Sequence, residues 1–131
     1  MAPIACFEDL IAWQKARALT QRIYRFVESG AAGRDFKLAD QLRSAVVSVM
    51  SNVAEGFDRR TPRDFRRFLI VAKASCAEVQ SLLYVALDAG YLPGAEFESA
   101  LSEARELSRV LGGLIAAVTR YANSPHDDRR G

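Results

Sequence analysis

Few residues of this 131-residue sequence are suited to a metal or redox site. It has one histidine, His126, close to its C-terminal end, and two cysteines, Cys6 and Cys76, that lie far apart. A haem or di-iron site in a helical bundle uses inward-facing histidines and carboxylates, often as a Glu-x-x-His pair, and no such pair occurs here. The cysteines lack the short spacing of a zinc site, a redox motif or a disulfide framework. The sequence therefore predicts a protein with no metal and no cofactor.

The sequence also lacks the patterns that accompany catalysis. No serine or cysteine stands in a recognisable nucleophile motif, and no glycine-rich phosphate loop follows a strand. No segment alternates apolar and polar residues as a strand does, and nothing repeats at a solenoid period. We therefore expect a non-enzymatic protein without a β-sheet.

Long apolar runs and a targeting segment are missing too. No stretch approaches the roughly 20 apolar residues of a membrane span, and the first residues, MAPIACFEDL, lack the basic flank and apolar core of a signal peptide. Half of the residues are apolar and only four are proline, which is typical of a globular chain. We expect one soluble, cytoplasmic domain over residues 1–131, with its core in about 7–121 and a flexible polar tail in 122–131.

Helical periodicity is what the sequence does contain. Four segments carry apolar residues at intervals of three and four, which indicates amphipathic helices over about 7–29, 38–56, 62–89 and 96–121. A threonine cap followed by proline, at Thr61-Pro62, marks the start of the third helix. Short connections between helices of this length favour antiparallel neighbours, so the expected fold is an all-α, up-down-up-down four-helix bundle.

Glycines are expected at places where the chain turns or packs closely. Residues 30–33 predict a flexible turn, and Gly56 is expected to end the second helix because glycine adopts the left-handed conformation easily. Gly112 and Gly113 interrupt the last predicted helix at a cost of about 1–2 kcal/mol. Close packing of the backbone there on a neighbouring helix would offset that cost.

A stripe of small polar residues runs along the second predicted helix. If the chain reverses at about residues 58–61, Ser44 is expected near Ser75. Glu78 would then lie near Gln41 and Arg43, and we predict an ion pair or hydrogen bond between Glu78 and one of them. Such a polar lock would fix the helix register, and the alternative hypothesis is a ligand-binding role. The stripe is Ser44, Ser48, Ser51, Asn52 and Glu55, and the predicted lock is Gln41, Arg43, Ser44, Asn52, Glu55, Ser75 and Glu78.

Positive charge is concentrated between the second and third predicted helices. Residues 58–67 contain five arginines and two aspartates, so their net charge is +3 while that of the whole chain is +2. Arginine offers paired donors to phosphate, and Phe57 or Phe65 could add stacking on a base. We call this segment the basic elbow, and its arginines are Arg59, Arg60, Arg63, Arg66 and Arg67.

Two interpretations of the basic elbow are open. In the first, it contacts RNA, DNA or an acidic protein. In the second, it is a solvated corner in which Arg66 or Arg67 pairs with Glu55 or Asp64. A monomer with one such elbow would bind nucleic acid weakly, whereas a ring of copies would strengthen binding through avidity and a summed electrostatic field.

Self-association is therefore the pivotal question. The apolar residues of the third and fourth predicted helices cover more of the helix surface than one bundle core needs. Several aromatic residues are also typical of interfaces, namely Trp13, Tyr24, Tyr84 and Tyr91. These observations favour a homo-oligomer, whose order the residues alone leave open.

Several motifs together resemble the four-helix-bundle S23 family, whose proteins are encoded in intervening sequences of bacterial 23S ribosomal RNA genes. The resemblance covers about residues 7–118. The chain departs from it with serine in place of the usual arginine at position 44 and alanine in place of glycine at position 74, which is still small enough for close helix packing. The motifs are FEDLIAW (7–13), QLR (41–43), SNVAEG (51–56), FRRFL (65–69), Ala74-Ser75 with Glu78, and GYL (90–92).

The resemblance implies an up-down bundle that assembles into a homopentamer. It also implies relatives among the accessory proteins of diversity-generating retroelements, which are basic pentamers that bind nucleic acid and a reverse transcriptase. Our leading hypothesis is a non-enzymatic bacterial homo-oligomer that binds RNA or single-stranded nucleic acid through the basic elbow. The alternative hypothesis is a protein–protein scaffold that docks a partner enzyme and binds no nucleic acid.

Overall fold

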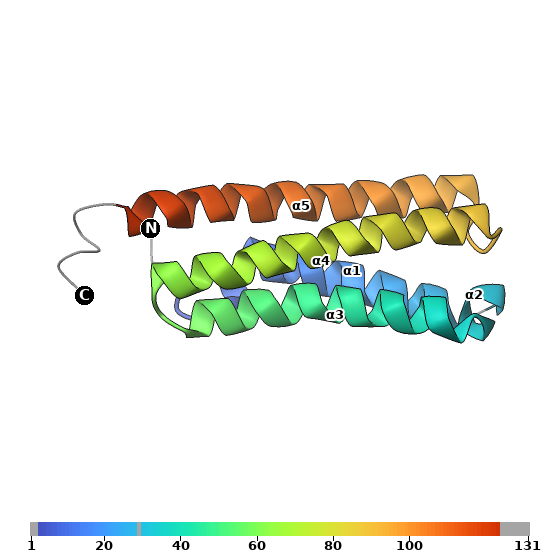
Figure 1. Cartoon of the computed structure of the whole chain (residues 1–131), viewed down its shortest axis with the longest axis horizontal. Coiled ribbons are helices and arrows are strands. Elements are labelled where there is room, and N and C mark those ends of the chain that lie inside the picture. Colours follow the sequence, from blue (N-terminus) through green and yellow to red (C-terminus); the bar gives the residue numbers. More distant parts are fainter. Residues whose placement is uncertain (1–2, 29, 124–131) are drawn as a thin grey trace.

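Helices account for all regular secondary structure in the computed structural model, which describes residues 3–28 and 30–123. The elements are η1 (Phe7–Asp9), α1 (Ile11–Glu28), α2 (Gly30–Arg34), α3 (Phe36–Asp58), α4 (Pro62–Asp88) and α5 (Gly94–Ala122). Figure 1 shows the long helices α1, α3, α4 and α5 side by side along one axis, with the short α2 at one end. The prediction of an all-helical bundle is confirmed.

Side-chain caps begin two of the long helices. Asp35 caps α3, because its carboxylate accepts a hydrogen bond from the backbone N–H of Leu38 at 3.2 Å. Thr61 caps α4 by accepting from the N–H of Asp64 at 3.3 Å, and Pro62 occupies the first turn. The start of α4 predicted at Thr61-Pro62 is confirmed.

Gly56 does not end α3, contrary to the sequence-based prediction. The helix continues to Asp58, and the left-handed residue that reverses the chain is Arg60, with φ of 66°. Gly56 is buried where α3 and α4 approach closely, since a Cβ added to it would lie 2.6 Å from the Cβ of Phe68. Glycine is therefore needed at position 56 because there is no space for a side chain. It is not needed for a left-handed backbone conformation.

Two further expectations differ from the structure, and the close packing that would offset the cost of Gly112 and Gly113 is not observed among the described residues. Residues 30–33 belong to the helical turn α2 and do not form a flexible loop. Gly112 and Gly113 do not pack closely, because a Cβ on Gly112 would meet only the Cε of Lys73 at 3.5 Å, and a Cβ on Gly113 would meet nothing within 4 Å. The helix α5 extends to Ala122, and the rest of the predicted tail from residue 124 onward, including His126, lies outside the described residues.

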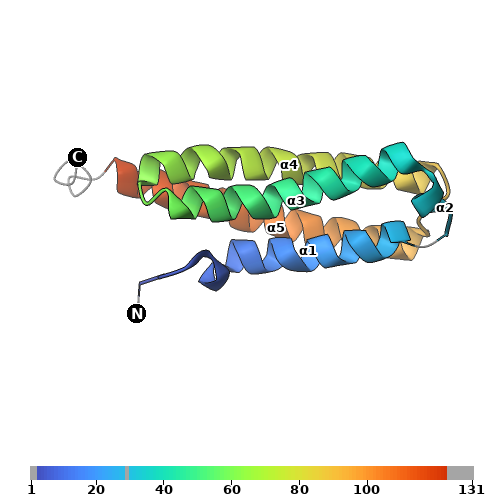
Figure 2. The ribbon, with the colours of Figure 1, turned by 90° about the horizontal axis from the view of Figure 1, so that it is seen from below.

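The first long helix also begins later than predicted. Phe7–Asp9 form a single 3₁₀ turn, Leu10 is extended, and α1 starts at Ile11. In Figure 2, α1 consequently starts short of the bundle end at which α3 passes into α4, and an extended segment precedes it. At that end the ends of α3, α4 and α5 have no fourth long helix beside them.

One apolar core joins the four long helices. The part of the chain that the structure describes contributes no buried polar or charged residue to it. Cys76 on α4 is fully buried, and its thiol donates a hydrogen bond to the carbonyl of Ala104 on α5 at 3.2 Å. The largest fully buried side chains are Leu19, Ile23, Leu42, Val46, Val49, Val53, Leu69, Cys76, Val79, Leu83, Leu107 and Leu111.

The helix α4 differs from the expectation that no segment approaches a membrane span in length and composition. By length and composition it could cross a membrane, with a mean hydropathy of 1.4 over its most apolar window. This is weak evidence for a membrane span, because the core helix of a soluble protein meets the same criteria. Here α4 contributes Leu69, Ala72, Cys76, Val79, Leu83 and Ala86 to the bundle core.

The contrast between Gly56 and Gly113 predicts opposite effects of the same substitution. Gly56→Ala should lower the free energy of unfolding by about 1–3 kcal/mol, because the new methyl group forces α3 and α4 apart. Gly113→Ala should raise it by about 0.5–1 kcal/mol, because the site is open and alanine favours the helix. Urea unfolding of both variants beside the original protein measures the difference, and a Gly56→Ala variant of undiminished stability would contradict the close approach.

Candidate nucleic-acid interface

The basic elbow lies at the end of the bundle where α3 passes into α4. The backbone N–H of Arg59 bonds to the carbonyl of Gly56 at 3.3 Å and closes α3. Arg60 then adopts its left-handed conformation, and Thr61 begins α4. This tight reversal brings the arginines Arg59, Arg60, Arg63, Arg66 and Arg67 together at one end of the molecule, and all of them are exposed.

Aromatic rings hold three of these guanidinium groups. The Cζ atoms of Arg59 and Arg67 lie 5.2 Å and 5.5 Å from the ring centre of Phe68, so the two arginines share one ring. The Cζ of Arg60 lies 5.1 Å from the ring centre of Phe57. These cation–π contacts orient the three arginine side chains.

Two aspartates, Asp58 and Asp64, are the acidic partners of the elbow arginines among the described residues. Arg67 donates a hydrogen bond to the carboxylate of Asp64 at 3.2 Å. Arg60 lies 4.0 Å from the carboxylate of Asp58 and 3.5 Å from the carbonyl of Ala5, which are both long contacts. The Arg67–Asp64 pair is one that the solvated-corner interpretation predicted, and an exposed pair of this kind adds little to stability.

The other two arginines face the C-terminal end of α5. The Nε of Arg66 donates to the hydroxyl of Thr119 at 2.8 Å. Arg63 forms no ion pair or hydrogen bond with any described residue. Both arginines line a shallow recess of about 400 Å³ together with Thr119, Ala122 and Asn123.

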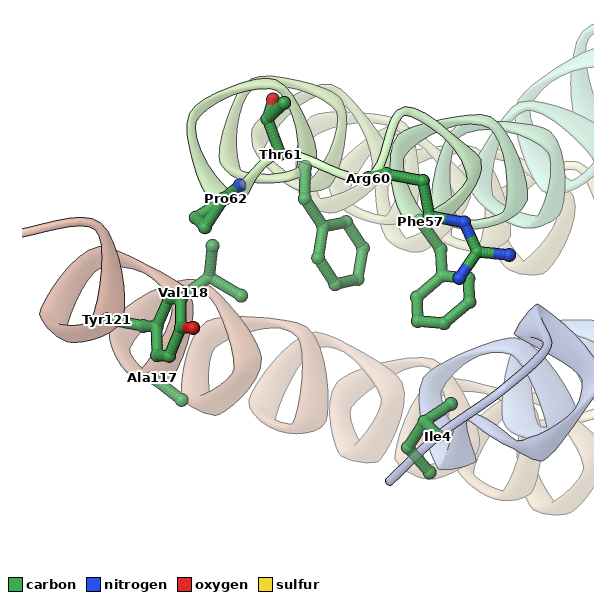
Figure 3. A pocket seen from close by; sticks show the side chains of 9 residues that line it. Ile4, Phe57, Arg60, Thr61, Pro62, Ala117, Val118 and Tyr121 are labelled. Carbon is green, nitrogen blue, oxygen red and sulfur yellow. The ribbon is translucent and has the colours of Figure 1, made fainter. Parts of the chain in front are cut away.

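An apolar cleft of about 360 Å³ opens beside the elbow (Figure 3). The helix α1 begins only at Ile11, so among the described residues no further long helix lies beside the ends of α3, α4 and α5 there. The rings of Phe57 and Phe65 meet edge to face on its wall, 5.8 Å apart. None of the described residues that line the cleft is acidic, and its walls are Ile4, Phe57, Arg60, Thr61, Pro62, Phe65, Ala117, Val118 and Tyr121.

A second surface, which we call the outer face of α4, is exposed and largely apolar. Ile70, Tyr84 and Val85 are between 42% and 48% exposed. Small residues lie between them at alternating steps of four and three, the spacing of a helix–helix seam. We define the outer face of α4 as Ile70, Ala74, Ala77, Ser81, Tyr84 and Val85.

The predicted polar lock forms with a different register. Ser48, and not Ser44, lies against Ser75, with their hydroxyl oxygens 2.8 Å apart. The side-chain amide of Asn52 donates to the carbonyl and the hydroxyl of Ser48 at 2.8 Å and 3.1 Å. The hairpin is thus displaced by one helical turn from the predicted pairing, in agreement with the contact of Gly56 with Phe68.

The predicted bond from Arg43 or Gln41 to Glu78 is wrong for the same reason. Arg43 instead pairs with Asp40 on its own helix, at 2.6 Å. Glu78 and Gln41 are exposed and form no hydrogen bond or ion pair with any described residue. The exposed Ser44 and Glu55 are likewise without a described partner, so Asn52 and Ser75 are the predicted lock residues that interact, through the added Ser48.

The two cysteine thiols are both shifted toward the protonated form. A hydrogen bond from the thiol of Cys6 to Asp9, 3.2 Å long, raises the pKa of Cys6. Burial raises the pKa of Cys76. A protonated thiol is a poor nucleophile and a poor metal ligand. Within residues 3–28 and 30–123, no group of three or more His, Cys, Asp or Glu side chains is placed to hold a metal ion.

Comparison with known families identifies the chain's relatives. Residues 8–113 match the family described as the 23S rRNA-intervening sequence protein. The chain belongs to this family. A search of curated proteins found no match.

A solved structure shows that the bundle is a recurrent fold. It is the crystal structure of a protein of unknown function from the S23 ribosomal protein family of Bacteroides thetaiotaomicron, with a TM-score of 0.75 and 19% identity. The match covers 81% of this chain and 96% of that protein. At this identity the similarity speaks for the fold alone, and the match to the S23 family agrees with the resemblance found in the sequence.

The corrected register can be tested with two serine substitutions one turn apart. Both Ser44→Ala and Ser48→Ala gain the same helix propensity, but only Ser48→Ala removes the hydrogen bonds to Ser75 and Asn52. Ser48→Ala should therefore be less stable than Ser44→Ala by about 1 kcal/mol. Equal unfolding free energies in urea, or a greater loss for Ser44→Ala, would contradict the observed lock.

Proposed function

We propose that this family member is a bacterial, cytoplasmic, non-enzymatic protein that binds RNA or single-stranded nucleic acid through the basic elbow. The observation that supports the proposal most is the gathering of five exposed arginines at one end of the bundle. Arg63 has no described partner, and the polar contacts of Arg60 are long, so their donors are available to phosphate oxygens.

The proposed active form is a homo-oligomer of antiparallel up-down-up-down bundles, with the pentamer as the order that the sequence resemblance implies. One elbow offers few phosphate contacts, so a single copy would bind weakly at physiological salt. Several elbows on one assembly would act on the same strand and raise the affinity by avidity. Oligomerisation is therefore part of the proposed function.

We propose the outer face of α4 as the contact between copies. Its small residues, Ala74, Ala77 and Ser81, would allow the backbones of two helices to approach closely, while Ile70 and Val85 would be removed from water. The same apolar face also supports a second candidate function, a scaffold that docks a partner protein and binds no nucleic acid. The reverse transcriptase implied by the sequence resemblance would be a partner of that kind.

Nucleic-acid binding is tested by replacing Arg59 and Arg60 together with alanine. Affinity for a short unstructured RNA should fall, and the slope of log affinity against log salt should become shallower by about 0.7 for each phosphate that the variant no longer neutralises. The bundle should stay folded, because both side chains are exposed. The measurement is fluorescence anisotropy at several salt concentrations, with circular dichroism to confirm folding.

The matched control for that experiment removes the same charge from the opposite end of the bundle. Arg25 and Arg34 are exposed and lie near the junction of α1 and α2. An Arg25→Ala and Arg34→Ala variant should keep the original affinity and slope. Failure of the intact oligomer to bind RNA even at low salt would remove the proposal and favour the scaffold.

The contact between copies is tested with charges on the outer face of α4. Replacing Ile70 and Val85 together with glutamate should lower the solution mass to that of one chain, 14.5 kDa. Val47→Glu is the control, because Val47 is similarly exposed, at 39%, but lies on α3 outside this face. Light scattering after size exclusion measures both masses. An unchanged mass in the Ile70/Val85 variant would show that copies associate elsewhere, and a single-chain mass for the original protein would refute oligomerisation.

A further inference from the structure

We infer that the apolar cleft beside the basic elbow receives one unpaired base of the bound strand. The inference rests on the proposed nucleic-acid function and adds a base-binding site to its phosphate contacts. The cleft has an aromatic wall, it opens to solvent, and a guanidinium group lies on its lining (Figure 3). These are the elements with which proteins hold unstacked bases.

The lining of the cleft is suited to a flat, partly polar ring. Phe57 supplies aromatic surface on one side, and Tyr121 and Val118 come from α5 across the cleft. The ring of Phe65, which also lines the cleft, lies against that of Phe57. Arg60 stacks on Phe57 with its Cζ 5.1 Å from the ring centre, so a charged plane adjoins the apolar space. A base stacked there would have guanidinium donors close to its edge.

The charges around the cleft favour a nucleotide over an apolar side chain of a partner protein. An apolar side chain needs no cation, but Arg60 lines this cleft, and its contacts to Asp58 and Ala5 are long. Among residues 3–28 and 30–123, no acidic side chain lines it. The recess of Arg63 and Arg66 adjoins the same C-terminal turns of α5. A strand with its base in the cleft would therefore have further arginines near its backbone.

The geometry also predicts which nucleic acids are excluded. A base inside a duplex is stacked on both faces and paired at its edge, so it cannot enter the cleft without leaving the helix. Arginine contacts to phosphate alone would not distinguish a single strand from a duplex in this way. The elbow should therefore prefer single strands to duplexes of the same sequence.

The test fills the cleft with an aliphatic side chain. Ala117 and Ala116 are adjacent, exposed alanines on α5, but only Ala117 lines the cleft. Ala117→Leu should bind a short unstructured oligoribonucleotide about 5- to 150-fold more weakly than the original protein, the range expected for loss of one stacked base. Ala116→Leu should bind it with the original affinity. Thermal unfolding checks that both variants fold.

A second measurement reports on the base directly. The fluorescence of an oligoribonucleotide that carries the base 2-aminopurine should be quenched when the strand binds the original protein or Ala116→Leu. It should not be quenched when the strand binds Ala117→Leu. The same strand annealed to its complement should bind the original protein and Ala117→Leu equally. These readouts need only a folded protein and the labelled strand.

The outcomes separate this inference from the function on which it rests. Salt-dependent binding with equal affinity in Ala117→Leu and Ala116→Leu, or without quenching, would overturn the base site and leave the phosphate-binding elbow standing. An original protein that binds no strand at low salt would overturn both. If Ala117→Leu kept its affinity for the single strand but no longer bound a partner protein, the cleft would instead receive a side chain of that protein. This result would also overturn the inference.

Discussion

The close approach of α3 to α4, where Gly56 lies against Phe68, is the constraint on which the rest of the structure depends. It sets the register of the helical hairpin, because a contact without an intervening side chain tolerates little sliding. Two turns further along, the Ser48–Ser75 hydrogen bond follows the same register. The approach also leaves only a few residues for the reversal, so Arg60 adopts a left-handed conformation that costs a non-glycine residue roughly 1–2 kcal/mol.

Local patterns were sufficient to predict the four long helices, although not all of their ends. Apolar periodicity depends only on neighbouring residues, and the start of α4 at Thr61-Pro62 depends on a cap whose donor lies three residues away. The hairpin register was mispredicted because it depends on a contact between distant residues, Gly56 and Phe68. A glycine near a helix end resembles a stop signal in sequence, and only the packing reveals that it is a point of close approach.

The arginine cluster of the candidate site could be predicted from the sequence, but the apolar cleft beside it could not. The arginine cluster is visible in the sequence because Thr61-Pro62 closely follows the end of α3 and keeps the basic residues together. The cleft was missed because it depends on where α1 begins relative to the ends of the other helices. The 3₁₀ turn Phe7–Asp9 and the extended Leu10 delay α1 until Ile11, and no local sequence pattern indicated that delay.

The late start of α1 also has a consequence for the dynamics of the bundle. At the elbow end three long helices lie together where four do elsewhere. Because local opening is easier where fewer apolar contacts are buried, we expect this end to open more readily than the middle of the bundle. Amide protons in the first turns of α4 and the last turns of α5 should accordingly exchange faster than those at mid-helix. Any molecule seated between these helix ends would slow that exchange, and occupation of the site would be coupled to the local folding of the bundle.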